Sequence, residues 1–346
     1  MHRFYSVISP AIAVLVMAVA LTPTLAAQTD PKLSSLKSPT INSSARSLKT
    51  KDLSQVRHGY ESVDKLKIFY REAGDPSKPA IVLLHGFPSS SHMYRNLIRD
   101  LADQYFLIAP DYPGFGESSF PSPDDYEYTF DNIAITINKF LEQRDLKKYS
   151  LYIQDYGAPV GFRIATAHPE RVQTLLIQNG NAYEEGISDA GWAPIKKYWN
   201  DKTVANEKVI IENVFTLKGM KWQYTHGTRN PDNIAPENWN LDFMKISRPG
   251  QHKVQLGLFY DYQYNIKHYP AWQAYLRKHQ PPALIVWGKH DAFFPVPGAE
   301  GYRRDLKDVD YNILDTGHFA LEEEGPYIAK KIRQFLTTRG IGQATP

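Results

Sequence analysis

Short, largely apolar runs recur along the chain, with stretches between them that are long enough for a helix. These runs lie at residues 80–84, 106–109, 151–154, 172–178, 283–287 and 311–314. Strands that are apolar on both faces and alternate with helices are typical of a parallel sheet covered by helices on both sides. The pattern therefore predicts an α/β fold with a mostly parallel sheet.

The segment before these runs has a different pattern. Residues 58–73 alternate apolar and polar side chains around Asp64 and Lys65. This alternation indicates a β-hairpin, which suits the antiparallel edge of a sheet. Together with the later runs, the hairpin predicts an eight-stranded sheet.

The alternation of strands and helices stops between residues 182 and 269. This stretch is rich in Trp, Tyr, Asn and Lys, has no strand-like run, and contains helix-compatible segments at residues 192–198 and 253–260. We therefore expect a helical insertion here. It divides one core into a first part, residues 58–181, and a second part, residues 270–346.

Asp155 lies where a buried strand turns into a helix. The strand covers residues 151–154 and the helix residues 158–167, an arrangement typical of a nucleophile elbow. A carboxylate at this apex can displace a leaving group from a saturated carbon and be released later as an ester. The alternative is structural, because Asp is also a favoured helix N-cap residue.

Asp291 and His318 each follow a strand of their own. Asp291 comes just after the run at 283–287, and His318 comes after the run at 311–314. The carboxyl ends of parallel strands meet at one edge of a sheet, where ligands bind. A nucleophile, an acid and a histidine in this chain order match the order of an α/β-hydrolase triad.

These features together resemble the α/β-hydrolase superfamily, over about residues 58 to 340. The resemblance rests on His85-Gly86-Phe87-Pro88, on residues 111–118 (DYPGFGES) and on Gln154-Asp155-Tyr156-Gly157. The last motif looks most like the branch with an Asp nucleophile, which includes epoxide hydrolases and haloalkane dehalogenases. The chain has no G-x-S-x-G motif, which argues against a serine esterase or lipase.

The resemblance implies a role for each site residue. Asp155 would be the nucleophile, His318 the general base and Asp291 the residue that orients it. The backbone N–H groups of Phe87 and Tyr156 are the expected oxyanion donors. The insertion at residues 182–269 would be a helical cap after the sixth strand. Asn179 is neutral where some relatives carry their acid, which places that role on Asp291.

The leaving group depends on donors from this cap. Epoxide hydrolases use paired cap tyrosines, for which Tyr198 and Tyr262 are the candidates. Haloalkane dehalogenases use N–H donors, and Phe87 supplies no side-chain donor, although Trp199 or Trp192 can supply one. Epoxide hydrolysis to a diol is therefore the leading hypothesis. Dehalogenation, another ester, lactone or C–halogen substrate, and a noncatalytic ligand-binding protein remain alternatives.

The composition of the chain limits which kinds of molecule it is expected to bind. The chain has 346 residues, a formal net charge of +3 and 42% hydrophobic residues, with no basic stripe of the kind that binds nucleic acid. Its histidines show no metal-ligand spacing, so neither a metal nor another cofactor is expected. The expected partners are a small apolar electrophile and water.

The amino terminus has the pattern of an export signal. His2 and Arg3 precede an apolar run at residues 11–21 and then small residues, so we expect a signal peptide at 1–26. That run is shorter than the ~20 residues that span a bilayer, so stable membrane insertion after cleavage is not expected. Residues 27–57 would form a flexible leader, and the protein would be periplasmic or secreted. The sequence contains no cysteine and hence no disulfide.

Overall fold

The structure is a computed structural model that describes residues 54–341. The predicted signal peptide and most of the predicted leader lie outside the described residues. Within them, no helix is both long and apolar enough to cross a membrane.

Eight strands form a single sheet in the described part of the chain, in the order β1-β2-β4-β3-β5-β6-β7-β8. β1 pairs antiparallel with β2 and β2 with β4, whereas all later pairs are parallel. The predicted edge hairpin and mostly parallel eight-stranded sheet are therefore confirmed. The strands are β1 Arg57–Val63, β2 Leu66–Ala73, β3 Ala80–Leu84, β4 Phe106–Pro110, β5 Tyr149–Gln154, β6 Val172–Gln178, β7 Ala283–Gly288 and β8 Val309–Leu314.

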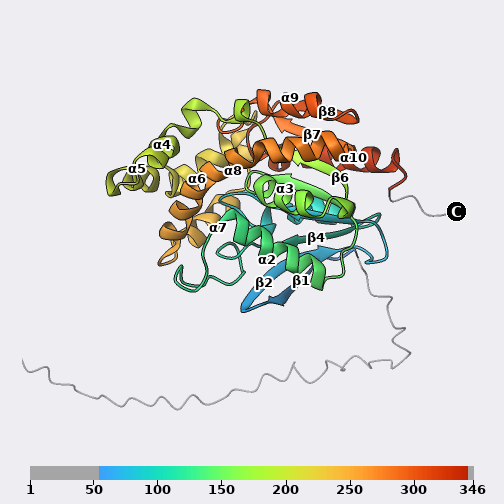
Figure 1. The fold of residues 1–346 in the computed structure, drawn as a ribbon, viewed down its shortest axis with the longest axis horizontal. Coiled ribbons are helices and arrows are strands. Elements are labelled where there is room, and N and C mark those ends of the chain that lie inside the picture. Colours follow the sequence, from blue (N-terminus) through green and yellow to red (C-terminus); the bar gives the residue numbers. More distant parts are fainter. Residues whose placement is uncertain (1–53, 342–346) are drawn as a thin grey trace, which may run out of the picture. The chain divides into compact units, whose positions relative to one another are not determined.

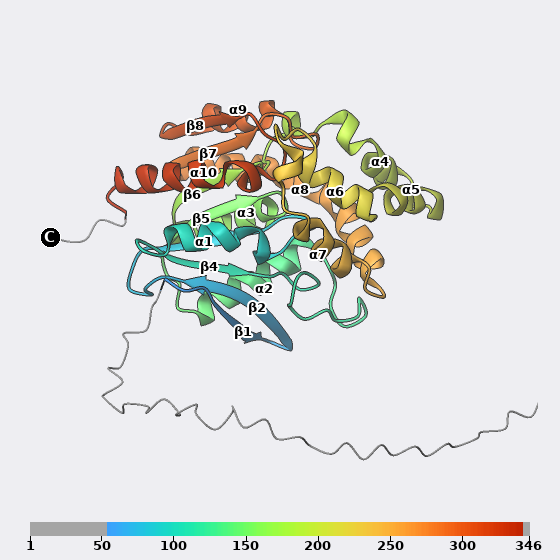
Figure 2. The same ribbon diagram turned by 180° about the vertical axis from the view of Figure 1, so that it is seen from behind.

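Helices cover both faces of this sheet (Figures 1 and 2). α1 and α10 lie on one face, and α2, α3 and α9 lie on the other. β3 to β7 are buried almost throughout because they are covered on both sides, which explains their continuous apolar runs. These helices are α1 Arg95–Leu101, α2 Phe130–Gln143, α3 Gly157–Ala167, α9 Val296–Asp305 and α10 Ala320–Thr337.

The cap is helical and is inserted between β6 and β7 (Figure 1). Ser188, Thr203 and Thr216 precede three of its helices, and each side-chain oxygen accepts a backbone N–H from the first turn. Such caps stabilise a helix by about 1 kcal/mol each, and they mark where each cap helix begins. The cap helices are α4 Asp189–Asn200, α5 Val204–Val214, α6 Leu217–Thr225, α7 Glu237–Ile246 and the first part of α8 Gln251–His279.

Helix α8 connects the cap to the core. It runs for 29 residues without interruption, with Pro270 inside it. The predicted boundary between residues 269 and 270 therefore falls within one helix. The same helix contacts α4, α5 and α7 of the cap and α2, α3 and α9 of the core, so it belongs to both parts.

Candidate active site

Asp155 is held in a strained turn between β5 and α3. Its φ of 49° is unusual for a residue with a side chain. Two glycines that pack against the turn, Gly157 and Gly86, leave the room that it needs. A Cβ on Gly157 would collide with the carbonyl oxygen of Leu84, and one on Gly86 would collide with Asp155 itself. Helix α3 has no side-chain cap, so Asp155 does not serve as the N-cap that was the structural alternative.

The Asp155 carboxylate is buried against backbone donors. Its Oδ1 accepts the Phe87 N–H at 2.6 Å, and the Tyr156 N–H also donates to the group. Burial raises the pKa of Asp155 to about 6, although the charge of His318 and these two N–H groups pull it down. The backbone groups expected to form an oxyanion hole thus both contact the proposed nucleophile.

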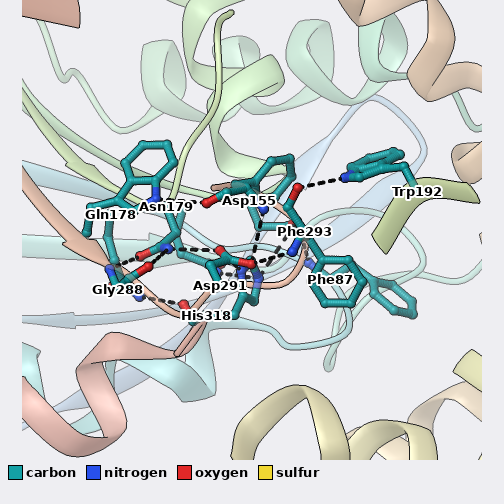
Figure 3. A network of polar contacts seen from close by, with 12 residues as sticks. Phe87, Asp155, Gln178, Asn179, Trp192, Gly288, Asp291, Phe293 and His318 are labelled. Atoms are coloured by element: carbon teal, nitrogen blue, oxygen red, sulfur yellow. Dashed lines mark hydrogen bonds and ion pairs between the residues drawn. The ribbon is translucent and has the colours of Figure 1, made fainter. Parts of the chain in front are cut away.

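His318 lies between the two carboxylates (Figure 3). Its Nδ1 is 2.6 Å from Asp291 Oδ2, and its Nε2 is 3.9 Å from Asp155 Oδ2. Burial lowers the pKa of His318, but the charge and hydrogen bond of Asp291, together with the charge of Asp155, outweigh burial and raise it. The structure therefore brings together the three residues that the sequence placed after separate strands.

Asp291 is fixed by donors on every side. The backbone N–H groups of Phe293 and Phe294 donate to Oδ1 at 2.7 and 3.1 Å. Asn179 Nδ2 donates to Oδ2 at 2.8 Å, and Asn179 Oδ1 accepts the Gly288 N–H (Figure 3). The neutral Asn179 thus supports Asp291 and does not replace it as the acid.

Gln154 is a site residue that the sequence analysis did not single out. It is fully buried, and its Nε2 lies 2.9 Å from His318 Nε2. With Nδ1–H donating to Asp291, the Nε2 lone pair of a neutral imidazole accepts from this amide. Gln154 therefore helps to hold the ring that faces Asp155. In the sequence, only its position directly before Asp155 could have indicated that Gln154 belongs to the site.

A cavity of about 50 Å³ lies in front of Asp155 and His318. The core contributes Phe87, Asp155, Tyr156, Phe293 and His318 to its wall. The cap contributes Gly191, Trp192, Pro194, Ile195, Val214, Gln223 and Phe259. The wall is thus mostly apolar, as expected for a small apolar substrate.

Two of the predicted substrate contacts lie elsewhere. The Tyr198 hydroxyl donates to Glu207 at 3.0 Å, and the side chain borders a different hollow next to α5 and α8. The Trp199 Nε1–H donates to the Phe259 carbonyl oxygen at 2.7 Å. Contrary to the prediction, neither side chain offers a donor to this cavity, because each has a partner within the cap.

Tyr262 supports the wall without being among the residues that line it. It is fully buried, and its ring centroid lies 4.4 Å from that of Trp192 and 6.0 Å from that of Tyr156. The Trp192 Nε1–H, the other candidate donor, is taken by the Phe293 carbonyl oxygen at 3.1 Å (Figure 3). No motif in the sequence pointed to Gln223 as the polar cap residue in the cavity wall.

Several known proteins are similar to this chain in sequence. The α/β hydrolase fold family matches residues 79–325. An uncharacterized hydrolase of Saccharomyces cerevisiae is 43% identical over 279 residues, which cover 80% of this chain and 95% of the relative. A haloalkane dehalogenase of Mycolicibacterium paratuberculosis is 37% identical over 290 residues, covering 77% and 86%. Epoxide hydrolase 1 of Caenorhabditis elegans is 23% identical over 310 residues, covering 83% and 73%.

The family match covers well over half of the chain, and the first two relatives exceed 30% identity over more than three quarters of it. The sheet order, the elbow and the inserted cap agree with the resemblance drawn from the sequence motifs. The chain belongs to the α/β-hydrolase fold family.

Proposed function

We propose that this hydrolase acts on small alkyl electrophiles through a covalent ester on Asp155. The observation that carries the proposal is the position of this carboxylate in the cavity wall. Its Oδ1 is held by the Phe87 N–H at 2.6 Å, and its Oδ2 is 3.9 Å from His318 Nε2. A buried carboxylate facing an apolar cavity and a histidine suits attack on carbon.

In the first step, an Asp155 oxygen bonds to the electrophilic carbon, and the leaving group departs with the bonding electron pair. Water then adds to the ester carbonyl while His318 takes its proton, and Asp291 stabilises the resulting imidazolium. The negative charge on the Asp155 oxygen is stabilised by the Phe87 and Tyr156 N–H groups. Collapse of this intermediate restores the carboxylate and releases the alcohol, whose oxygen takes the second proton of the water. His318 then gives the first proton to solvent, where it balances the departed halide.

The carbon–halogen bond is the electrophile that the site supports best. A halide leaves as a stable anion, whereas an opened epoxide leaves as an alkoxide and needs a proton. The cap residues that line the cavity include no tyrosine among the described residues. The 37% identity to a haloalkane dehalogenase supports the same choice. This reverses the order of the two hypotheses drawn from the sequence.

Epoxide opening is the second candidate, because Tyr262 lies within electrostatic reach of Asp155. Burial first, with the nearby Tyr269 and Asp155, raises the pKa of this hydroxyl well above its ordinary value. A phenol that is a weaker acid gives up its proton less readily, which is why this candidate comes second. In the noncatalytic alternative, the same cavity would bind a ligand without turnover.

Trapping of the ester tests all three possibilities. His318→Gln removes the base, so the first step should proceed and the adduct should persist, visible as an increase in the mass of the intact protein. A haloalkane adds only its alkyl group, whereas an epoxide adds its whole mass. We expect an adduct from 1-bromopropane and a smaller yield, or none, from 1,2-epoxybutane.

The control is His290→Gln, which changes an exposed histidine that pairs with Asp315. It should turn over substrate without accumulating an adduct. Addition of Asp155→Asn to His318→Gln should abolish the adduct. The covalent mechanism would be refuted if a folded His318→Gln protein formed no adduct with any substrate that the wild-type protein hydrolyses. Absence of turnover with every electrophile would favour the ligand-binding alternative.

A further inference from the structure

The cavity contains one polar cap side chain that the proposed mechanism has not used. Gln223 on α6 is 5% exposed and lines the cavity together with Asp155 and His318. Within residues 54–341, its one hydrogen-bond contact is from Nε2 to the Met220 sulfur, at 4.0 Å. Sulfur is a weak acceptor. An amide left so poorly paired in an apolar cavity costs stability, which suggests that its partner is a ligand.

Neighbouring contacts fix the position of this amide. Trp222 packs edge-on against Phe293, and Tyr224 stacks on Phe319 with ring centroids 3.9 Å apart. Both phenylalanine rings contact the ring of His318, with centroids 5.6 and 5.0 Å away. Helix α6 is thus anchored on either side of Gln223, directly over the catalytic histidine.

The other candidate donors of the cap are paired, except the Tyr262 hydroxyl, which is buried without a hydrogen-bond partner among the described residues and is not part of the cavity wall. The Trp192 and Trp199 indole N–H groups donate to backbone carbonyls, and the Tyr198 and Tyr224 hydroxyls donate to carboxylates. Among the described cap side chains that line the cavity, Gln223 is therefore the one that keeps an uncommitted N–H.

We propose that the Gln223 amide is the cap's hydrogen-bond donor to the leaving group, and that it selects groups that depart as stable anions, halides above all. This inference rests on the proposed function. Attack by Asp155 expels the leaving group away from the core, toward the cap where Gln223 lies. A side-chain amide stabilises an anion by donating a hydrogen bond, but it does not give up its proton at neutral pH. It therefore suits a halide and is a poor partner for an alkoxide.

The test compares leaving groups on one alkyl chain. In the His318→Gln protein, the rate of adduct formation is measured in a single turnover with 1-chloropropane, 1-bromopropane and 1-iodopropane. Gln223→Leu removes the donor and nearly conserves volume. We expect the reaction with the chloride to slow about 100-fold and that with the iodide by less than about tenfold, because the poorer leaving group depends more on the donor. Gln223→Glu should slow both further through charge repulsion.

Gln255→Leu is the matched control. Gln255 is a cap glutamine with 1% exposure that borders a separate hollow beside Phe87, so the three rates should stay within about twofold of the parent. An equal loss for all three halides in Gln223→Leu would overturn the proposal. So would unchanged adduct formation combined with slower ester hydrolysis in proteins that retain His318, since Gln223 would then position the water.

Bromide binding separates this inference from the proposed function. If no haloalkane gives an adduct with the parent protein, the proposed dehalogenation fails. Titration calorimetry with sodium bromide then still tests Gln223. We expect the wild-type protein to bind bromide at least about tenfold more tightly than Gln223→Leu. Equal affinity, or no binding by either protein, would overturn the role of Gln223.

Discussion

Asp155 has an environment that suits a nucleophile better than a structural carboxylate. Burial disfavours its charge, while two backbone N–H groups and His318 favour it, and the balance leaves its pKa at about 6. The carboxylate is therefore ionised at neutral pH yet sheltered from bulk water, which strengthens its interaction with an electrophile. Gln154 and Asn179 do not contact Asp155 through these bonds. They hold His318 and Asp291 in place, respectively.

The pH dependence of ester formation follows from this balance. Protonated Asp155 cannot attack, so the rate of the first step should fall as pH drops through about 6. His318 lowers the pKa of Asp155, so His318→Gln should move the midpoint to a higher pH. Single-turnover adduct formation, measured by intact mass between pH 4 and pH 9, checks both. An unshifted midpoint, or one near the ordinary carboxyl value of about 4, would contradict the assignment.

Among the elements, α6 and α7 join the cap to the core through a buried polar cluster. The Tyr224 hydroxyl donates to Asp242 at 2.6 Å, and Asn238 Nδ2 donates to Glu322, which also pairs with Arg95. Most of these groups are neutralised by a partner of opposite charge or by hydrogen bonds. Asp242 is 3% exposed and has no cation bonded to it in the described part of the chain, so it is the costly member of the cluster.

Asp242 should therefore make stability depend on pH. Burial raises its pKa in the folded protein to about 7, above the value of about 4 for an unfolded carboxyl, so its contribution to stability is full below about pH 4 and is lost progressively as pH rises to about 7. Asp242→Asn should leave the melting temperature at pH 4 nearly unchanged and raise it at pH 8. The gain in unfolding free energy is roughly 1 kcal/mol for each unit of pKa shift.

Asp232→Asn is the matched control for this change, because Asp232 is exposed on the same cap. Thermal unfolding followed by circular dichroism at both pH values compares the two variants with the wild-type protein. The control should melt like the wild type at each pH. A lower melting temperature for Asp242→Asn at pH 8 would contradict this prediction, because it would show that the buried charge of Asp242 stabilises the folded protein.

For the molecule as a whole, the cap sets how much substrate fits. The cavity holds about 50 Å³, and one water occupies about 10–15 Å³ on this measure. Substrates of only a few carbon atoms fit this arrangement of cap and core. Larger ones require the cap to move, or its side chains to be smaller.

Ile195 is the wall residue to shorten, since it comes from α4 and reaches the cavity from the cap. Ile195→Ala should raise kcat/KM for 1-bromohexane relative to 1-bromopropane by at least about tenfold, because one methylene in an apolar pocket is already worth about that much. Ile210→Ala, which shortens a buried cap residue away from the cavity, should leave the ratio unchanged. An unchanged ratio in both variants would mean that Ile195 does not limit chain length.

The sequence by itself determined the sheet and the positions of Asp155, Asp291 and His318 in it. Continuous apolar runs form strands covered on both faces, and the carboxyl ends of parallel strands necessarily meet at one edge. These are consequences of local pattern and chain order. A residue that follows such a strand can therefore be placed at the site without knowledge of any other contact.

Only the tertiary structure decided which cap side chains face the substrate. Tyr198, Trp199 and Gln223 all lie on helices whose exposed, buried and cavity-facing sides are mixed in composition. Their directions are set by particular partners: Glu207 for Tyr198, and the Phe259 carbonyl, 60 residues along the chain, for Trp199. A helical pattern does not encode contacts of this kind. The positions of Asp155, Asp291 and His318 were thus readable from the chain, whereas the cap side chains that face the cavity were not.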